Sequence, residues 1–201
     1  MAFFIVFEGG DGSGKSTQVR SLMRRLRRRG TNVIRTREPG GTSLGQSLRT
    51  LLKSGQPMTP ISELMLFEAA RAQLVQQVIK PLLAEGGVVI ADRFTSSTIA
   101  YQGYGRGLDL ELIEQLNREA TGGLEPDLTV LLDLPVETAL ARKINDAEDN
   151  FDSAPVDFHR KIKRGYSALA AADPEGWLVL DGQRPPGELG REIWDKVQKL
   201  I

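Results

Sequence analysis

Residues 3–17 read FFIVFEGGDGSGKST, an apolar run that leads through a glycine-rich loop into a helix-patterned stretch. The loop, residues 9–16, matches the pattern G-x-x-x-x-G-K-[ST] of phosphate-binding loops. Its glycines let successive backbone N–H groups turn toward an anion, and the dipole of the following helix adds to the attraction. Because strand, loop and helix occur in the order that this mechanism requires, the stretch predicts a site for the phosphates of a nucleotide.

The side chains of the loop predict how the nucleotide is held. We expect the Lys15 ammonium to reach the β- and γ-phosphates and the Ser16 hydroxyl to ligate the Mg²⁺ that accompanies them. The backbone of the loop is expected to surround the phosphates. The whole predicted phosphate site is Gly9, Gly10, Asp11, Gly12, Ser13, Gly14, Lys15, Ser16 and Thr17.

The composition is that of an ordinary globular protein. The 201 residues are enough for one substantial core, so we expect a single domain over residues 1–201. Lys plus Arg and Asp plus Glu number 26 each, which leaves no overall field to hold a nucleic acid. No apolar run approaches the roughly 18 residues of a membrane span. The chain has no cysteine, which excludes disulfides and thiol catalysis. We expect a cytoplasmic protein without nucleic-acid or membrane partners.

Short apolar runs alternate with helix-patterned stretches along the chain. Such runs are typical of strands covered on both faces, so the pattern predicts an α/β fold with a parallel sheet. Strands are expected at 3–7, 33–34, 88–91, 128–132 and 177–180. Helices are expected from about 17 to 30 and at 43–54, 61–84, 110–121, 136–147, 158–172 and 188–200. The acidic segment 145–155 is expected to form a mobile loop over the site.

Asp92 and Arg93 follow the expected strand 88–91, at the sheet edge where open α/β sheets bind ligands. Beside a phosphate loop, Asp92 is a candidate for holding Mg²⁺, directly or through water, and Arg93 for neutralising a phosphate. The alternative is a helix cap followed by a surface arginine. Asp133 ends the strand 128–132 and could play the part of Asp92, or it could cap the helix that Pro135 opens.

The phosphate acceptor must be recognised outside the loop. Arg37 and Arg49 follow the second strand and would lie on the same sheet edge as the loop if the sheet is parallel. Phe67 and Arg71 are four residues apart on one helix face, which places an aromatic ring beside a guanidinium. Such a pair could stack on a nucleobase and hydrogen-bond its edge. The alternative for the same spacing is a core phenylalanine with a surface arginine.

Four segments together resemble the bacterial thymidylate kinases. They are FEGGDGSGKSTQ at 7–18, REPGGT at 37–42 with Leu44, Gly45 and Arg49, Phe67 with Arg71, and DRFTSSTIAYQG at 92–103. The phosphate loop alone marks only the superfamily, whereas the second and fourth segments are discriminating. The likeness extends from residue 3 to about residue 182.

The resemblance implies a P-loop kinase fold, with a central five-stranded parallel sheet flanked by helices and a short lid at about 142–157. It implies transfer of a phosphoryl group from Mg·ATP to dTMP, giving dTDP, with ATP and dTMP as partners and Mg²⁺ as cofactor. Relatives of this kind are homodimers, so a homodimer is implied as well. Lys15 and Arg93 are the catalytic cations expected near the transferred group.

The resemblance also implies a set of contacts to dTMP. At the base, Phe67 would stack on thymine, Arg71 would contact its edge, and Gln102 and Thr98 would lie nearby. Ser97 is assigned to the same site.

At the sugar and phosphate, Asp11 would bind the deoxyribose 3′-hydroxyl. Tyr101 would lie where a 2′-hydroxyl would project, and Arg49 and Arg93 would hold the monophosphate. Cations are needed there because two polyanions repel each other as they approach.

One departure from the family pattern concerns the transition-state arginine, which these kinases supply from the loop or from the lid. The loop position after Asp11 is Gly12, so a lid arginine is expected, yet the lid reads DNFD at 149–152, with Asn150 where relatives carry arginine. We expect Arg142, or else Lys143, to supply the cation, with Arg160 as a further substitute.

Two alternatives to a thymidylate kinase stay open at this point. The chain could be another deoxynucleoside or nucleotide kinase, because the phosphate loop does not identify the acceptor. It could also be a nucleotide-binding paralogue that has lost catalysis, which the lid sequence allows. The chain has no Asn-Lys-x-Asp guanine motif, which argues against a GTPase.

Overall fold

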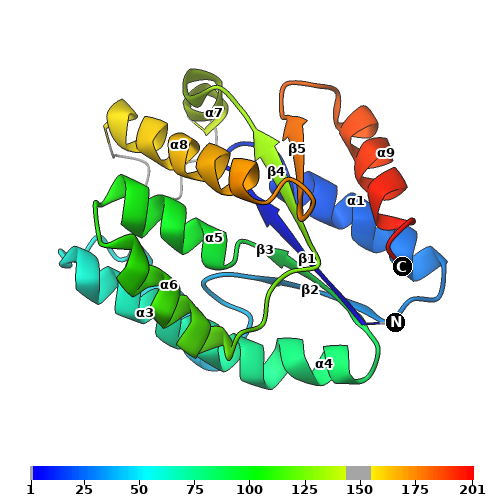
Figure 1. Cartoon of the computed structure of the whole chain (residues 1–201), viewed down its shortest axis with the longest axis horizontal. Coiled ribbons are helices and arrows are strands. Elements are labelled where there is room, and N and C mark those ends of the chain that lie inside the picture. The colour runs from blue at the N-terminus through cyan, green and yellow to red at the C-terminus, as the bar shows by residue number, and fades with distance from the viewer. Residues whose placement is uncertain (1, 144–154) are drawn as a thin grey trace.

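In the computed structural model, which describes residues 2–143 and 155–201, a five-stranded sheet forms the centre of the molecule (Figure 1). Its order is β2-β3-β1-β4-β5, and every pairing is parallel. The strands are β1 (Phe3–Glu8), β2 (Val33–Arg37), β3 (Val88–Asp92), β4 (Leu128–Asp133) and β5 (Trp177–Asp181). The predicted α/β fold is confirmed.

Helices cover both faces of the sheet. They are α1 (Lys15–Arg28), α2 (Ser43–Lys53), α3 (Pro60–Leu74), α4 (Lys80–Ala84), α5 (Thr95–Thr98), α6 (Leu110–Thr121), α7 (Val136–Lys143), α8 (Val156–Ala172) and α9 (Pro186–Val197). Two π-helical segments, η1 (Val75–Ile79) and η2 (Ile99–Gly105), continue α3 and α5. Among the described helices, none is both long and apolar enough to cross a membrane.

Strand β1 is buried on both faces, and the two-residue period of a strand divides its side chains between two cores. Phe3, Ile5 and Phe7 pack with α1 and α9. Phe4 and Val6 point the other way and pack with α3, η1 and β3. Each fully buried side chain of this size contributes about 1.5–3 kcal/mol. The same alternation places Glu8 on the Phe4 side, toward α5 and α8.

The carboxyl end of β1 is where the chain builds its site. Strand β1 lies between β3 and β4: the connection from β1 runs to one side of it, to β2, and the later connection from β3 runs to the other side, to β4. This arrangement is a topological switch point, where open α/β sheets form a ligand crevice. The phosphate loop leaves β1 at this point, and β3 and β4 end beside it in Asp92 and Asp133.

The boundaries of several predicted elements need correction. Strand β2 continues to Arg37, and α1 begins at Lys15 rather than near Thr17. The helix predicted at 61–84 runs from Pro60 to Ala84 but contains the π-helical segment η1. The end of the helix predicted at 136–147, and most of the predicted mobile loop at 145–155, lie outside the described residues.

The helical segment formed by α5 and η2 was not predicted. Its sequence, TSSTIAYQGYG, is rich in β-branched residues and glycine, which have low helix propensity and hide the helical period. Tertiary packing stabilises it instead, because η2 lies against α8. The approach is close: a Cβ atom added to Gly165 of α8 would come within 2.9 Å of the Tyr104 ring.

Candidate active site

The phosphate loop wraps around the side chain of its own lysine. Gly14 adopts the left-handed conformation before α1, with φ of 95°, and Lys15 opens the helix. The Lys15 ammonium donates to the carbonyl oxygens of Gly9 and Gly10, each at 2.9 Å. Burial, helped by the charge of Arg93, lowers the pKa of Lys15 to about 8, although nearby carboxylates oppose the shift. The cation is therefore preorganised at the loop.

A cavity of about 440 Å³ lies over the loop. Its lining includes seven of the nine predicted phosphate-site residues, and it adds cations from other elements. The loop residues are Asp11, Gly12, Ser13, Gly14, Lys15, Ser16 and Thr17, and the added arginines are Arg20, Arg37, Arg49, Arg93 and Arg142. Gly9 and Gly10 face a neighbouring cavity and point their carbonyls at Lys15.

The predicted metal ligands meet at the edge of this cavity. The Ser16 hydroxyl donates to Asp92 Oδ2 at 3.4 Å, so the ends of α1 and β3 bring both oxygens together. These hard oxygen donors suit Mg²⁺, which usually takes only one or two protein ligands beside phosphate and water. Within the described residues, no group of three or more metal-ligating side chains occurs. Asp133, the other candidate, forms an ion pair with Lys163 of α8.

A second cavity, of about 110 Å³, lies next to the first and is built from side chains. Its lining includes all nine residues predicted to contact the acceptor: Asp11, Arg49, Phe67, Arg71, Arg93, Ser97, Thr98, Tyr101 and Gln102. Four of its lining residues, Asp11, Glu38, Arg49 and Arg93, also line the larger cavity. The two cavities therefore share a wall of charged side chains.

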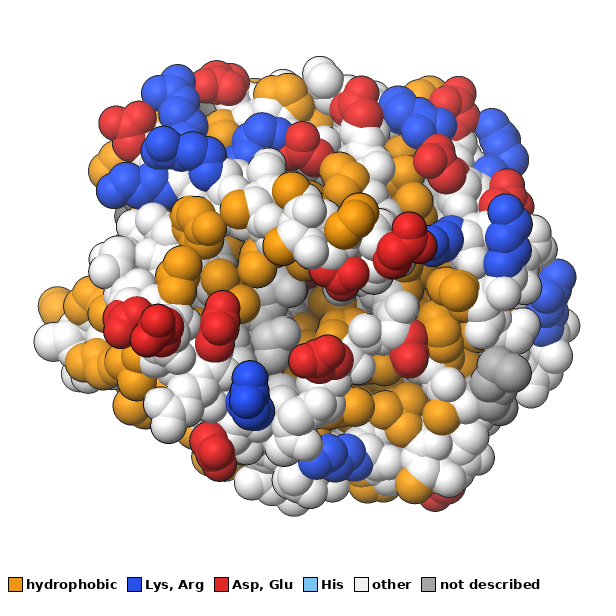
Figure 2. Space-filling view, in the orientation of Figure 1, with side chains coloured by type: hydrophobic (Ala, Val, Ile, Leu, Met, Phe, Trp, Pro, Cys, Tyr) orange, Lys and Arg blue, Asp and Glu red, His pale blue; other side chains and the backbone are white. Residues whose placement is uncertain are grey.

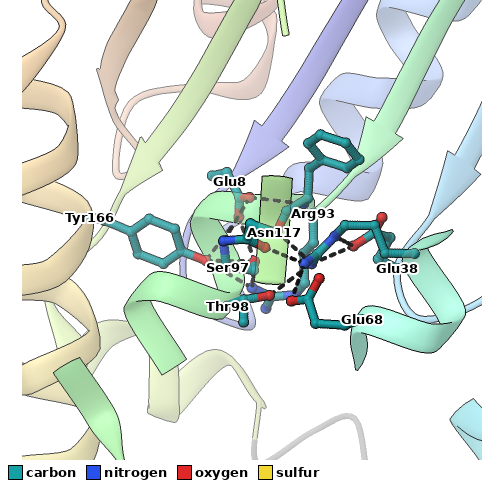
Figure 3. Close-up of polar contacts among 10 residues, drawn as sticks. Glu8, Glu38, Glu68, Arg93, Ser97, Thr98, Asn117 and Tyr166 are labelled. Carbon is teal, nitrogen blue, oxygen red and sulfur yellow. Dashed lines mark hydrogen bonds and ion pairs between the residues drawn. The ribbon is translucent and has the colours of Figure 1, made fainter. Parts of the chain in front are cut away.

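Arg71 is the most deeply buried charge of the second cavity, at 1% exposure, whereas Phe67 is only half-buried. The alternative of a core phenylalanine with a surface arginine is therefore wrong. The five N–H groups of Arg71 make five hydrogen bonds of 2.6–3.2 Å, to Glu38, Glu68, Asn117, Thr98 and the Phe94 carbonyl. Figure 3 shows the side chains of Glu38, Glu68, Thr98 and Asn117 converging on one point.

The charges around Arg71 shift one another's pKa values. Burial raises the pKa of Glu38 to about 7, against the opposing charge of Arg71. Burial likewise raises the pKa of Glu68, again opposed by Arg71. For Arg71, burial works against the charge, but the two carboxylates outweigh it and raise its pKa above the usual value. The three groups form a buried cluster that depends on its single cation.

Arg93 links the two cavities. Its backbone lies in the left-handed region, with φ of 75°, an uncommon conformation for a residue with a side chain. Its guanidinium donates to Asp11 at 2.6 Å, and to the hydroxyls of Ser97 and Tyr166 at 3.2 Å each. The same group lies 5.0 Å from the centre of the Tyr101 ring.

A carboxylate that the sequence reasoning missed organises the residues after Arg93. Glu8 Oε1 accepts from the backbone N–H groups of Phe94 and Ser97, at 3.0 and 3.2 Å. Its Oε2 accepts from the hydroxyls of Ser97 and Tyr166, at 2.7 and 2.8 Å (Figure 3). Burial raises the pKa of Glu8, against the charge of Arg93 and these hydrogen bonds. The alternation of β1 was the one sequence signal that could have placed Glu8 here.

Comparisons with known proteins agree on one family. A family model described as thymidylate kinase matches residues 7–193. The thymidylate kinase of Synechococcus sp. (strain JA-2-3B'a(2-13)) is 52% identical over 198 residues, which cover 98% of this chain and 95% of that protein. That of Dehalococcoides mccartyi (strain ATCC BAA-2100 / JCM 16839 / KCTC 5957 / BAV1) is 44% identical and covers 100% and 98%. The chain belongs to the thymidylate kinase family.

A solved structure supports the same assignment at the level of the fold. The crystal structure of thymidylate kinase from Ehrlichia chaffeensis superposes with a TM-score of 0.81 at 36% identity, and the match covers 98% of each chain.

Helix α7, which leads into the segment expected to form the lid, lies against the phosphate loop at Gly12. Arg142 of α7 lines the larger cavity and donates to the Gly182 carbonyl at 3.2 Å. A Cβ atom at Gly12 would come 2.7 Å from the Ala139 carbonyl oxygen, and Gly12 has φ of 74°. The loop therefore has no room for an arginine at that position. The side chain of Lys143 and the segment 149–152 lie outside the described residues.

Proposed function

We propose that this chain transfers the γ-phosphoryl group of ATP to dTMP, giving dTDP and ADP, the reaction of its family. The observation that carries the proposal is the shared wall between the two cavities. A donor in the larger cavity and an acceptor in the smaller one would present their phosphates to each other across Asp11 and Arg93. Proximity of this kind, together with charge neutralisation, supplies most of the catalysis in phosphoryl transfer.

The loop residues 9–17 would hold the donor. Their backbone N–H groups and the Lys15 ammonium would bind the β- and γ-phosphates, for which the buried lysine is already oriented. Ser16 and Asp92 would hold Mg²⁺. When bound, the ion neutralises charge on the phosphates and orients them.

The acceptor phosphate would bind between Arg49 and Arg93. Arg93 is fixed by Asp11, Ser97 and Tyr166, so its charge needs little reorganisation when the phosphate arrives. Asp11 would accept a hydrogen bond from the 3′-hydroxyl of the sugar, and the Tyr101 ring would leave no space for a 2′-hydroxyl.

The base would occupy the part of the smaller cavity lined by Phe67, Thr98 and Gln102. Phe67 would stack on thymine, with Thr98 and Gln102 at its edge. Every N–H group of Arg71 already has an acceptor, so a contact between Arg71 and the base would exchange one of those bonds. Arg71 would thus both bind the base and hold the pocket together.

The cation that stabilises the transferred phosphoryl group would come from the end of α7, where the expected lid begins. Arg142 lines the donor cavity and lies beside Gly12, which supports it as the group that stabilises the transferred phosphoryl. Lys143 is the second candidate.

We also propose a cytoplasmic homodimer. Large apolar side chains are exposed along α2 and α3, which supports self-association: they are Leu44, Leu51, Ile61 and Met65. On the face drawn in Figure 2, side chains of Lys and Arg are interspersed with those of Asp and Glu. This face therefore offers no single-sign field for a nucleic acid.

The proposal is tested by supplying the purified chain with Mg·ATP and one acceptor at a time. We expect ADP to form with dTMP and not with thymidine, and chelation of Mg²⁺ to abolish turnover. Phosphorylation of thymidine but not of dTMP would make the chain a nucleoside kinase. Binding of ATP and dTMP without any turnover would instead indicate a nucleotide-binding protein that has lost catalysis.

A further inference from the structure

Gln102 of η2 lines the acceptor cavity, and it is 2% exposed. Its Nε2 donates to Glu63 Oε1 of α3 at 2.7 Å. An ionised carboxylate has only acceptor atoms, so the amide nitrogen, and not the amide oxygen, must face Glu63. The direction of the Gln102 amide is therefore set by its neighbour.

Glu63 is itself fixed by a cation. Arg106, at the end of η2, donates to both carboxylate oxygens of Glu63, at 3.0 and 3.3 Å. The Arg106 guanidinium lies 4.9 Å from the centre of the Phe158 ring. Glu63 is 8% exposed, so this ion pair holds a largely buried carboxylate in place.

The oxygen of the Gln102 amide is left to the ligand. None of the described residues donates a hydrogen bond to its Oε1, and Gln102 lines the cavity. Because Glu63 holds the amide nitrogen of Gln102, the amide oxygen is the atom that can accept a hydrogen bond from a base.

We propose that Glu63, held by Arg106, is a positioning residue that makes the pocket select a base with an N3–H donor. Thymine and uracil carry a hydrogen on N3, whereas cytosine presents a lone pair there. An amide oxygen attracts the first and repels the second, and unpaired buried polar groups are the strongest basis for rejecting an analogue. The inference rests on the proposed function, because it assumes that Gln102 lies at the base.

The substitution Glu63→Gln tests the inference with almost no change of shape. A glutamine at position 63 has one oxygen, which Arg106 attracts, so its amide nitrogen turns toward Gln102 and reverses the Gln102 amide. We expect the ratio of kcat/KM for dTMP to that for dCMP to fall at least about tenfold, mainly through KM. The ratio for dTMP to dUMP should stay within about threefold, because both bases carry the N3 hydrogen.

A second variant, Arg106→Met, removes the cation that holds Glu63 but leaves the carboxylate opposite Gln102. Its dTMP to dCMP ratio should fall as well, but less than in Glu63→Gln, because nothing in this variant reverses the Gln102 amide. An unchanged dTMP to dCMP ratio in a folded Glu63→Gln variant would overturn the inference. Equal falls in the dTMP to dCMP ratio and in the dTMP to dUMP ratio would also overturn the inference, because a pocket that is merely loosened would treat both bases alike.

A measurement on the wild-type chain covers the case in which the variants do not fold. We expect dUMP to compete with dTMP at least about tenfold better than dCMP does. Equal competition by dUMP and dCMP would contradict the role of Gln102 and Glu63. A wild-type chain that does not phosphorylate dTMP at all would defeat the proposed function, which is a different result.

Discussion

The larger cavity, proposed to bind ATP (the donor cavity), and the smaller one, proposed to bind dTMP (the acceptor cavity), share a wall but are built differently. The donor cavity is built around one continuous loop, whose backbone and Lys15 lie within a few residues of each other, with arginines added from other elements. The acceptor cavity is formed by side chains from several helices and held by a buried charge cluster around Arg71. Local sequence therefore determines the first cavity, whereas the second depends on contacts between distant parts of the chain.

The largest expected effect comes from removing the cation of the acceptor cavity. The substitution Arg71→Met leaves Glu38 and Glu68 buried without their partner, which should cost about 3–5 kcal/mol of stability. The free energy of unfolding in urea measures the loss. Adding Glu68→Gln to the variant should restore part of it.

The half-buried Arg49 of the same cavity provides the control. Arg49→Met should weaken dTMP binding while the stability changes by less than about 1 kcal/mol. Equal losses of stability in Arg71→Met and Arg49→Met would show that the buried cluster does not hold the pocket together.

A single substitution in the phosphate loop should lower turnover without changing the binding of dTMP in the acceptor cavity. Lys15→Met removes the buried ammonium at the loop, and we expect kcat to fall by about 10²–10³-fold. The affinity for dTMP in the absence of ATP, measured by calorimetry, should be unchanged. A parallel loss of dTMP affinity would mean that the two cavities are not separable.

Substitutions at the end of α7, where the expected lid begins, should lower kcat by less. We expect Arg142→Ala to lower kcat by roughly 10–100-fold, because a cation beside the transferred phosphoryl would be lost. Lys143→Ala is the matched variant one position along. If each variant kept kcat within about threefold of the wild type, which is less than ~1 kcal/mol of barrier, the assignment of the cation to this segment would be wrong.

The smallest effect concerns the pH profile of the donor cavity. The pKa of Lys15 is lowered to about 8, so the free enzyme loses this charge as the pH rises through that value. We expect kcat/KM for ATP to be constant just below pH 8 and to fall by up to about tenfold per pH unit above it. In Lys15→Arg the fall above pH 8 should disappear, because arginine keeps its charge. Persistence of the same fall in that variant would assign it to another group.

The sequence was sufficient for the donor cavity and for the parallel sheet. The phosphate loop carries its own chemistry in consecutive residues, and the five strands are short apolar runs. The resemblance to a family named nine residues that the structure places in the lining of one cavity, but spacing alone had left the fate of Phe67 and Arg71 open. The physical reason is that spacing along a helix does not say which face is buried.

The residues that hold the acceptor cavity were missed for a related reason. Glu8 and Tyr166 are 158 residues apart in the chain, and Arg71 and Asn117 are 46 apart. Carboxylates are mostly found at the surface, so nothing in the local sequence marks Glu8 as buried. The packing of α8 against α5 and η2, and of α3 against α6, brings such partners together.

At Gly12 the structure explains why the phosphate loop carries no arginine. The sequence indicated only that the loop lacks an arginine there. The close approach of α7 at Ala139 and the positive φ of Gly12 explain why a side chain is excluded, and the same helix carries Arg142. Helix α7 thus occupies the space that a side chain at position 12 would need, and it carries Arg142, which is expected to supply the cation.

The contact between the two cavities at Asp11 is the central claim, and a cycle of four kcat/KM values tests it most directly. Wild type and Asp11→Ala are each assayed with dTMP and with dTMP that lacks the 3′-hydroxyl. We predict that removing the hydroxyl costs the wild type about 10–100-fold, the value of a hydrogen bond to a charged group, and costs Asp11→Ala less than about threefold. Equal costs in both proteins would contradict the account, because the donor loop would then not hold the acceptor.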